Sequence, residues 1–142
     1  MPARMTTFLH ADQTTGTTGL TTSYGTARTH NLGANLPPFA VKPYWLGILD
    51  TLNLHVHAIA GGCTKLTVRV TSDSTGNESI LPDTEATIAT GIGTATTGSV
   101  AFAAGVGMTN LNPTQTDAIV YVWVKTDACT CNLKESTIVW RE

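Results

Sequence analysis

The stretch DAIVYVWVKT, residues 117–126, predicts the strongest strand of the sequence, because its β-branched and aromatic side chains fit a pleated sheet. Successive side chains of a strand point to opposite faces. One face of this strand therefore carries Val120, Val122 and Val124, and the opposite face is apolar as well. An antiparallel strand of a sandwich normally has one apolar and one solvated face. The second apolar face must therefore be covered by another part of the structure.

That second face carries Ile119, Tyr121 and Trp123. Full burial of a large apolar side chain contributes roughly 1.5–3 kcal/mol, so leaving three of them exposed is costly. The cover can come from the loop at 105–116, from the N-terminal segment or from a second subunit. We expect the N-terminal segment or another subunit to provide it, and we predict that these three residues lie in an interface.

Other stretches alternate between apolar and polar residues with the two-residue period of a half-buried strand. They are DTLNLHVHAIA (50–60), in which Leu52, Leu54, Val56, Ala58 and Ala60 form the inner face, TKLTVRVTS (64–72), TEATIAT (84–90), SVAFAA (99–104), CTCNL (129–133) and STIVWRE (136–142). Turn-forming residues separate these stretches, and none has a helical period. The pattern predicts an all-β protein: a single β-sandwich or jelly-roll-like domain of about seven or eight antiparallel strands. A small barrel is the alternative fold.

The composition agrees with this fold class. The chain has 142 residues, enough for one domain, and it contains 27 threonines and 13 glycines, which favour strands and turns. Charged residues make up only 13%, and the net charge is -2. No stretch reaches the roughly 18 apolar residues of a membrane helix, and the N-terminus has no signal-peptide core. No Lys/Arg cluster is present to bind phosphates, so we expect neither membrane nor nucleic-acid binding.

Residues 1–43 differ from the rest because Thr, Gly, Asn and Pro dominate and no alternation persists. We expect an extended N-terminal arm over 1–43 and a β-sandwich domain over 44–142. Ordering each arm residue costs about 1–2 kcal/mol, so the arm either lies along another surface or stays a mobile tail. We favour the first alternative. The apolar residues that would anchor the arm in an oligomer or capsid contact are Phe8, Leu9, Leu20, Tyr24, Leu32, Leu36 and Phe39.

The sequence contains no catalytic motif: neither G-x-S-x-G, nor H-E-x-x-H, nor a P-loop is present. We therefore expect no enzyme activity and no cofactor. The loop at 73–78 offers oxygen atoms to calcium but lacks the EF-hand pattern, and we interpret it as a turn between strands.

A zinc site is a weaker alternative. His55 and His57 share one face of a predicted strand, and Cys129 and Cys131 share one face of another. If the two strands were neighbours, two imidazoles and two thiolates would suit tetrahedral zinc. Histidines on an outer strand face more often contact solvent or a partner. We expect the cysteines to be reduced thiols and the metal to be absent.

Aromatic residues raise the possibility of carbohydrate binding. Tyr44, Trp45, Trp123 and Trp140 could stack on sugar rings if they were exposed. Trp123 and Trp140 lie in strand patterns, which favours a place in a core or an interface. An exposed platform at Tyr44 and Trp45 is what a glycan-binding module requires.

Two stretches together support a resemblance: VRVTSD (68–73) leading through ESILPDTEATIAT (78–90), and IVYVWVKTDACTCNLKESTIVWRE (119–142). The chain resembles the head decoration, or cement, proteins of tailed bacteriophages and related small β-sandwich virion proteins. The likeness covers about 90 residues and lies in Thr-rich strands, low charge and an extended N-terminal arm. It implies a protein of the outer capsid lattice, often a homotrimer, that clamps neighbouring subunits of the major capsid protein.

We therefore predict a non-enzymatic virion protein that is made in the host cytoplasm and stabilises the outer surface of a capsid. The charged residues among the first 43 are Arg4, Arg28, Lys42 and Asp12, so the net positive charge of this segment is small. Contact with a genome requires far more positive charge. Two alternatives remain: a tail or fibre module that binds host-surface glycan, and a minor coat or vertex protein of a jelly-roll virus.

Overall fold

The computed structural model describes seven parts of the chain: residues 7–11, 18–32, 48–60, 64–90, 97–107, 119–128 and 130–141. Every regular element in these parts is a β-strand. The strands are β1 (Thr7–Ala11), β2 (Thr18–Leu20), β3 (Arg28–Asn31), β4 (Ile48–Ala60), β5 (Lys65–Thr71), β6 (Ser79–Thr87), β7 (Ala89–Thr90), β8 (Thr97–Gly107), β9 (Ile119–Thr126) and β10 (Thr130–Arg141). Within the described residues, no helix is long and apolar enough to cross a membrane.

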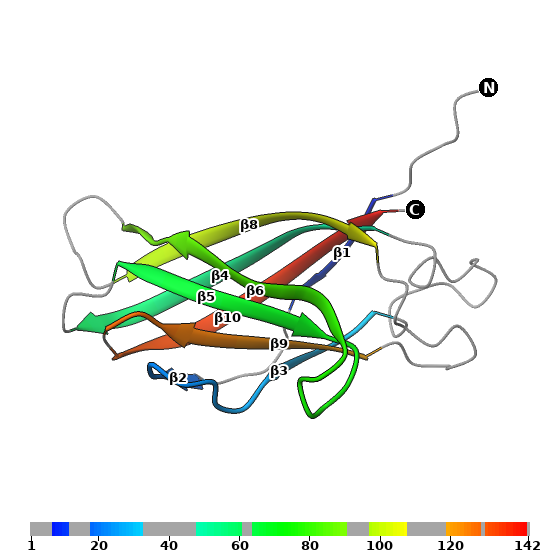
Figure 1. Cartoon of the computed structure of the whole chain (residues 1–142). Coiled ribbons are helices and arrows are strands. Elements are labelled where there is room, and N and C mark those ends of the chain that lie inside the picture. The colour runs from blue at the N-terminus through cyan, green and yellow to red at the C-terminus, as the bar shows by residue number, and fades with distance from the viewer. Residues whose placement is uncertain are drawn as a thin grey trace, which may run out of the picture.

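The strands form two sheets that lie one over the other as two layers (Figure 1). Sheet A has the order β1-β10-β4-β8-β7, and β2 also pairs with β10. Sheet B has the order β3-β9-β5-β6. All strand pairs are antiparallel. The predicted all-β sandwich is therefore confirmed.

The strand pairs are nested in the manner of a jelly roll. Strand β1 pairs with β10, β3 with β9, β4 with β8, and β5 with β6. Apart from the short β2 and β7, consecutive strands alternate between the two sheets, except at the β5–β6 hairpin. A double-sheet jelly roll of eight strands has this arrangement. The topology thus brings both ends of the described chain to the same edge of sheet A.

The core lies between the sheets and is built by the alternation that the sequence shows. In β9 the three valines are buried, whereas Ile119, Tyr121 and Trp123 on the other face are partly exposed. The core side chains are Leu20, Leu32, Leu49, Leu52, Leu54, Val56, Leu66, Val68, Val70, Ile80, Leu81, Ile88, Val100, Phe102, Val120, Val122, Val124, Cys131, Leu133, Ile138 and Trp140. The interior of the described sandwich is therefore mostly apolar, and the buried polar residues include His30 and Ser136, which are hydrogen-bonded to each other.

A β-bulge interrupts the alternation near the end of β4. Ala58 adopts a left-handed backbone conformation, with φ of 53°, and the register with β10 shifts between Asn132↔His57 and Thr130↔Ala60. The extra residue of a bulge turns the following side chains to the opposite face. Ala58 is consequently exposed, and Ile59 packs against the core instead. The prediction that Ala58 points inward was wrong for this reason.

Three described strands come from the predicted arm, residues 1–43. Strands β1 and β2 pair with β10, and β3 pairs with β9, so each lies at the edge of a sheet of its own chain. Leu20 and Leu32 are buried in the core. The boundary at residue 43 lies outside the described residues, and the division into arm and domain stays a prediction.

Strand β10 runs without a break through the region where the sequence predicted two strands. A register shift against β4 between Leu133 and Glu135 marks a bulge at Lys134. Strand β1 pairs with residues 137–141 and β2 with residues 131–133, so neither pairs with β10 between them. Two side chains of β3 contact β10 in this gap: Arg28 Nη2 donates to the Lys134 carbonyl at 2.9 Å, and His30 Nε2 lies 2.7 Å from Ser136 Oγ.

Candidate functional site

The centre of the outer face of sheet A carries no formal charge, whereas Lys134 and Glu135 on β10 are exposed. Its described side chains come from β4, β8 and β10 and are mostly uncharged. We call this surface the sheet A face; it consists of Thr51, Asn53, His55, Ser99, Ala101, Glu135, Thr137 and Val139. In the central row, Asn53 pairs with Thr137 on one side and with Ala101 on the other. Glu135, the single formally charged group of the set, is opposite His55.

The outer face of sheet B differs because it carries paired charges. Lys65 Nζ lies 2.9 Å from Glu85 Oε1, and the hydrogen bond raises the pKa of Lys65. Arg69 on β5 forms a two-point pair with Asp83 on β6, with Nε 2.6 Å from Oδ1 and Nη2 3.1 Å from Oδ2. The guanidinium lowers the pKa of Asp83. A fork-to-fork pair of this kind fixes both side chains in one geometry.

Tyr24 holds this pair in place. It follows β2 in sequence, and its hydroxyl donates to Asp83 Oδ1 at 3.0 Å. The Arg69 guanidinium carbon lies 4.9 Å from the centre of the Tyr24 ring, and Lys125 Nζ lies 4.8 Å from it. Both distances suit cation–π attraction. Burial, followed by the hydrogen bond to Asp83, raises the pKa of Tyr24 well above its ordinary range, so the phenol remains a donor.

The loop between β5 and β6, residues 72–78, is closed by one carboxylate. Asp73 accepts hydrogen bonds from the amide nitrogens of Asn77, at 3.0 Å, and Glu78, at 2.9 Å, and from the Thr75 hydroxyl. These bonds, the Thr75 one first, lower the pKa of Asp73 to about 2. The interpretation of this loop as a turn is confirmed.

Trp123 lies between this loop and the sheet. Its indole nitrogen donates to the Thr71 hydroxyl at 2.9 Å. Gly76 has a left-handed φ of 80°, and a Cβ placed there would lie 3.4 Å from the Trp123 ring. The loop at 72–78 and Tyr24 thus provide contacts within the chain on the outer face of β9. The alternative cover, the loop at 105–116, lies almost entirely outside the described residues.

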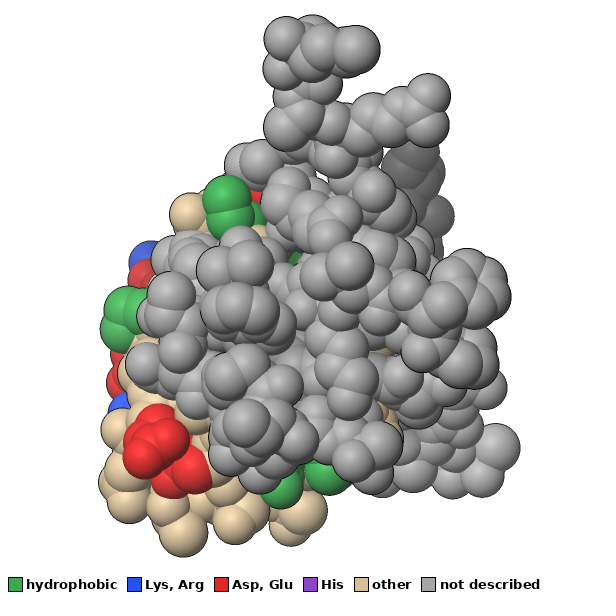
Figure 2. All heavy atoms as spheres, turned by 90° about the vertical axis from the view of Figure 1, so that its right-hand side faces the viewer, with side chains coloured by type: hydrophobic (Ala, Val, Ile, Leu, Met, Phe, Trp, Pro, Cys, Tyr) green, Lys and Arg blue, Asp and Glu red, His purple; other side chains and the backbone are tan. Residues whose placement is uncertain are grey.

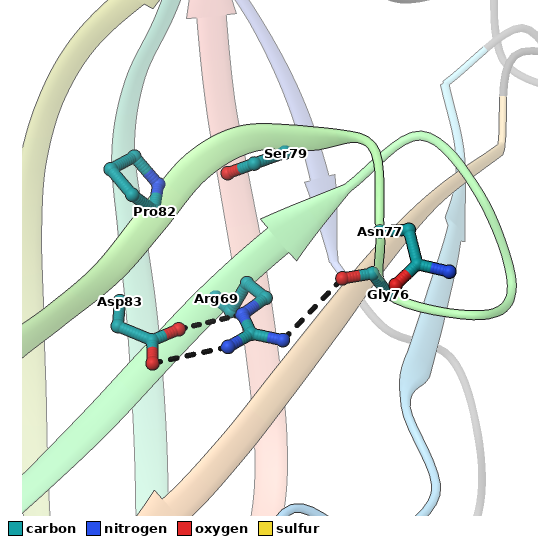
Figure 3. A pocket seen from close by; sticks show the side chains of 6 residues that line it. All are labelled: Arg69, Gly76, Asn77, Ser79, Pro82 and Asp83. Carbon is teal, nitrogen blue, oxygen red and sulfur yellow. Dashed lines mark hydrogen bonds and ion pairs between the residues drawn. The ribbon is translucent and has the colours of Figure 1, made fainter.

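An open pocket of about 490 Å³ lies beside the charge pair. It is lined by Arg69, Gly76, Asn77, Ser79, Pro82 and Asp83. Figure 3 shows Arg69 between Asp83 on one side and Gly76 on the other. The Gly76 carbonyl accepts a hydrogen bond from Arg69 Nη1 at 3.4 Å.

In a view of the molecule from one end, the described surface is mostly tan, with a compact group of red acidic side chains (Figure 2).

The predicted anchor residues of the arm fall in different places. Leu20 and Leu32 belong to the core of their own chain, and Tyr24 belongs to the charged cluster. Phe8 and Leu9 lie in β1, where their backbones pair with Trp140 and Val139. Leu36 and Phe39 lie outside the described residues, as does the predicted aromatic platform of Tyr44 and Trp45. Trp140 is buried in the core.

The strands that carry the zinc candidates are neighbours, as the hypothesis required. His57 pairs with Asn132 on the outer side of sheet A, and His55 is exposed on that side. Cys131 is a free thiol buried in the core on the other side, and burial raises its pKa. Cys129 lies outside the described residues. His55 and His57 therefore do not meet Cys131, and the described residues contain no cluster of three possible metal ligands.

Arg69, Asp83 and Lys125 are site residues that the sequence alone does not predict. The alternation of apolar and polar residues predicts that Arg69 lies on the outer side of its strand, and this is the one sign in the sequence that it belongs to a surface site. Asp83 is 14 residues away and Tyr24 is 59 residues from Asp83. Only the pairing of β5 with both β6 and β9 brings these groups together.

No protein-family model matches the sequence, and no curated protein matches it. Three solved structures are similar to the chain at low identity. A chain of the infectious bursal disease virus Gt strain has a TM-score of 0.44 and 13% identity over 97% of this chain and 33% of that one. The chain thus spans a third of that protein. A structure of Desmodium yellow mottle tymovirus has a TM-score of 0.35 and 17% identity with this chain, and the match covers 99% of this chain and 87% of that one. The tobacco streak virus coat protein has a TM-score of 0.37 and 11% identity, covering 100% and 88%.

Proposed function

We propose that this chain is a virion structural protein, which acts through its surfaces and catalyses no reaction. The observation that carries the proposal is the nested eight-strand jelly roll, whose described interior is mostly apolar. Jelly rolls of this kind build viral capsids as well as lectins and cupins. Because a fold alone does not define a function, the surfaces must support the choice.

The sheet A face supports assembly with a second copy of this chain. Burying a charge costs far more than burying a hydroxyl or a methyl group. Thr51, Asn53, Ala101 and Thr137 lie on the central strands of this sheet and carry no charge, whereas the outer face of sheet B carries ion pairs. The sheet A face is therefore the one that costs less to remove from water. We propose a further contact at Ile119, Tyr121 and Trp123, which keep part of their surface exposed.

The finer role that we propose is decoration of the outer surface of a capsid, as a homotrimer that contacts the major capsid protein. The charge supports an external position, because the first 43 residues have a net charge of only +2 and Arg28 is used inside the fold, against the Lys134 carbonyl. Contact with a genome requires far more positive charge. Many weak contacts in a lattice act together and stabilise the assembled form.

A matched pair of variants tests the assembly surface. Thr137→Arg places a charge on the sheet A face, and Thr67→Arg places the same charge at a partly exposed threonine on the outer face of sheet B. We expect Thr137→Arg to abolish oligomers and capsid binding in light scattering and electron microscopy, and Thr67→Arg to retain both. Circular dichroism checks that both variants fold. Equal assembly of the two variants contradicts the proposed surface.

The jelly-roll topology also favours a second role, in which the chain itself forms a shell as a coat or vertex protein. Expression of the chain alone separates the two roles. A shell protein forms closed particles without another protein, whereas a decoration protein stays a small oligomer and binds only to preformed capsids. Removal of a decoration protein from particles should lower their resistance to heat and osmotic shock. Unchanged resistance contradicts the stabilising role.

A further inference from the structure

The pocket beside the charge pair lies on the outer face of sheet B. Its volume is about 490 Å³, and because it is open to solvent, a ligand bound there would keep part of its own surface exposed. It opens between the loop at 72–78 and β6, and its polar groups come from both elements (Figure 3). The sheet A face lies on the opposite sheet and can be tested separately, whereas the proposed contact at Ile119, Tyr121 and Trp123 lies on the same sheet as the pocket.

The charges of the pocket favour a neutral ligand. Arg69 and Asp83 neutralise each other through two hydrogen bonds. An anion would have to displace the Asp83 carboxylate from a two-point pair, and a cation would have to displace the guanidinium. A neutral ligand can bind without breaking the pair, because each group retains further donor or acceptor capacity.

The lining places donors beside acceptors. Arg69 and the Asn77 amide are donors, although Asn77 Nδ2 already gives one of its two protons to Thr75 Oγ1 at 3.1 Å; the Asp83 carboxylate and the Gly76 carbonyl accept, and Ser79 contributes a hydroxyl. A sugar hydroxyl both donates and accepts, so it requires the two kinds of group side by side. Pro82 adds an apolar surface that can contact the C–H groups of a sugar ring.

Both sides of the pocket are held in place before any ligand arrives. Tyr24 fixes Asp83 through its hydroxyl and is itself held between Arg69 and Lys125. On the other side, Asp73 fixes the loop through the amides of Asn77 and Glu78. A preorganised site loses little conformational freedom on binding. We propose that this pocket binds a neutral saccharide, with Arg69, Asn77 and Asp83 as its hydrogen-bonding groups.

Titration monitored by amide NMR tests the proposal on the full chain. The neutral probes are methyl α-D-glucopyranoside, methyl β-D-galactopyranoside and N-acetyl-D-glucosamine, and the anionic probes are inorganic phosphate and acetate. We expect at least one neutral sugar to shift the amides of residues 76–83 and neither anion to do so. Shifts with an anion alone, or no shift with any of the three sugars, overturn the proposal.

Three variants sharpen the test. Asn77→Ala removes one lining amide and its bond to Thr75 but keeps the backbone bond to Asp73, and we expect it to weaken sugar binding at least about tenfold. Thr87→Ala removes an exposed polar side chain at the other end of β6, outside the pocket, and should leave binding unchanged. Asp83→Asn leaves Arg69 without its counter-charge, so we expect phosphate binding to appear and sugar binding to fall. Equal sugar affinity in all variants places the binding outside this pocket.

Discussion

Substitution of Ser136 by alanine tests how firmly the N-terminal segment belongs to the fold. Ser136 lies on β10 in sheet A, and its hydroxyl is 2.7 Å from Nε2 of His30 on β3 in sheet B. Both residues are 0% exposed. The two positions are 106 residues apart in sequence. The contact therefore joins the two sheets and attaches residues 28–31 to the C-terminal strand.

The expected cost follows from burial. Removing the hydroxyl leaves Nε2 of a fully buried imidazole without this partner, and water cannot reach it to replace the bond. An unsatisfied buried polar group costs roughly 1–3 kcal/mol. For 142 residues, an unfolding entropy of about 2.1 cal/mol/K per residue sums to about 0.3 kcal/mol/K. A loss of about 2 kcal/mol therefore lowers Tm by about 7 °C.

Calorimetry and urea unfolding measure this loss, with Ser99→Ala, an exposed serine on β8, as the matched control. We expect the control to change the free energy of unfolding by less than about 0.5 kcal/mol. The double variant Ser136→Ala/His30→Leu removes both polar partners and should recover part of the loss. A Ser136→Ala protein as stable as the control would refute the reasoning, because it would show that β3 does not dock on β10.

Three further predictions concern backbone geometry and pH. Gly98→Ala should lower the free energy of unfolding in urea by about 1–3 kcal/mol, because the added Cβ would clash with a methyl group of Ile88; Ile88→Ala in the same chain should relieve part of that cost. Ala58→Gly should raise the free energy of unfolding by about 0.5–1 kcal/mol, because glycine adopts the left-handed conformation without strain; a loss of stability contradicts this. The folded pKa of Asp73, about 2, lies below the ordinary 3.8, so its bonds to the loop contribute fully above about pH 3.8 and are lost as pH falls through about 2. NMR titration of the Asn77 amide should show a midpoint near pH 2, and a midpoint near 3.8 contradicts the assignment.

The strands and their inward faces followed from the sequence because the two-residue period is a local property. The run from Ile119 to Val124 predicted both a strand and the burial of its valines, and both predictions are confirmed. The threonine-rich composition and low charge likewise predicted an all-β fold. The role of the half-exposed face of β9 as an interface stays a prediction.

What the sequence could not determine depends on contacts between distant residues. The bulge at Ala58, which turned that side chain outward, arises from the register between β4 and β10. The cluster of Tyr24, Arg69 and Asp83 exists because three strands and the segment after β2 meet on one face. Local patterns set which side of a strand a residue faces, because the period is fixed by backbone geometry. Tertiary structure alone decided which faces meet, because strand pairing joins residues whose separation in sequence carries no such information.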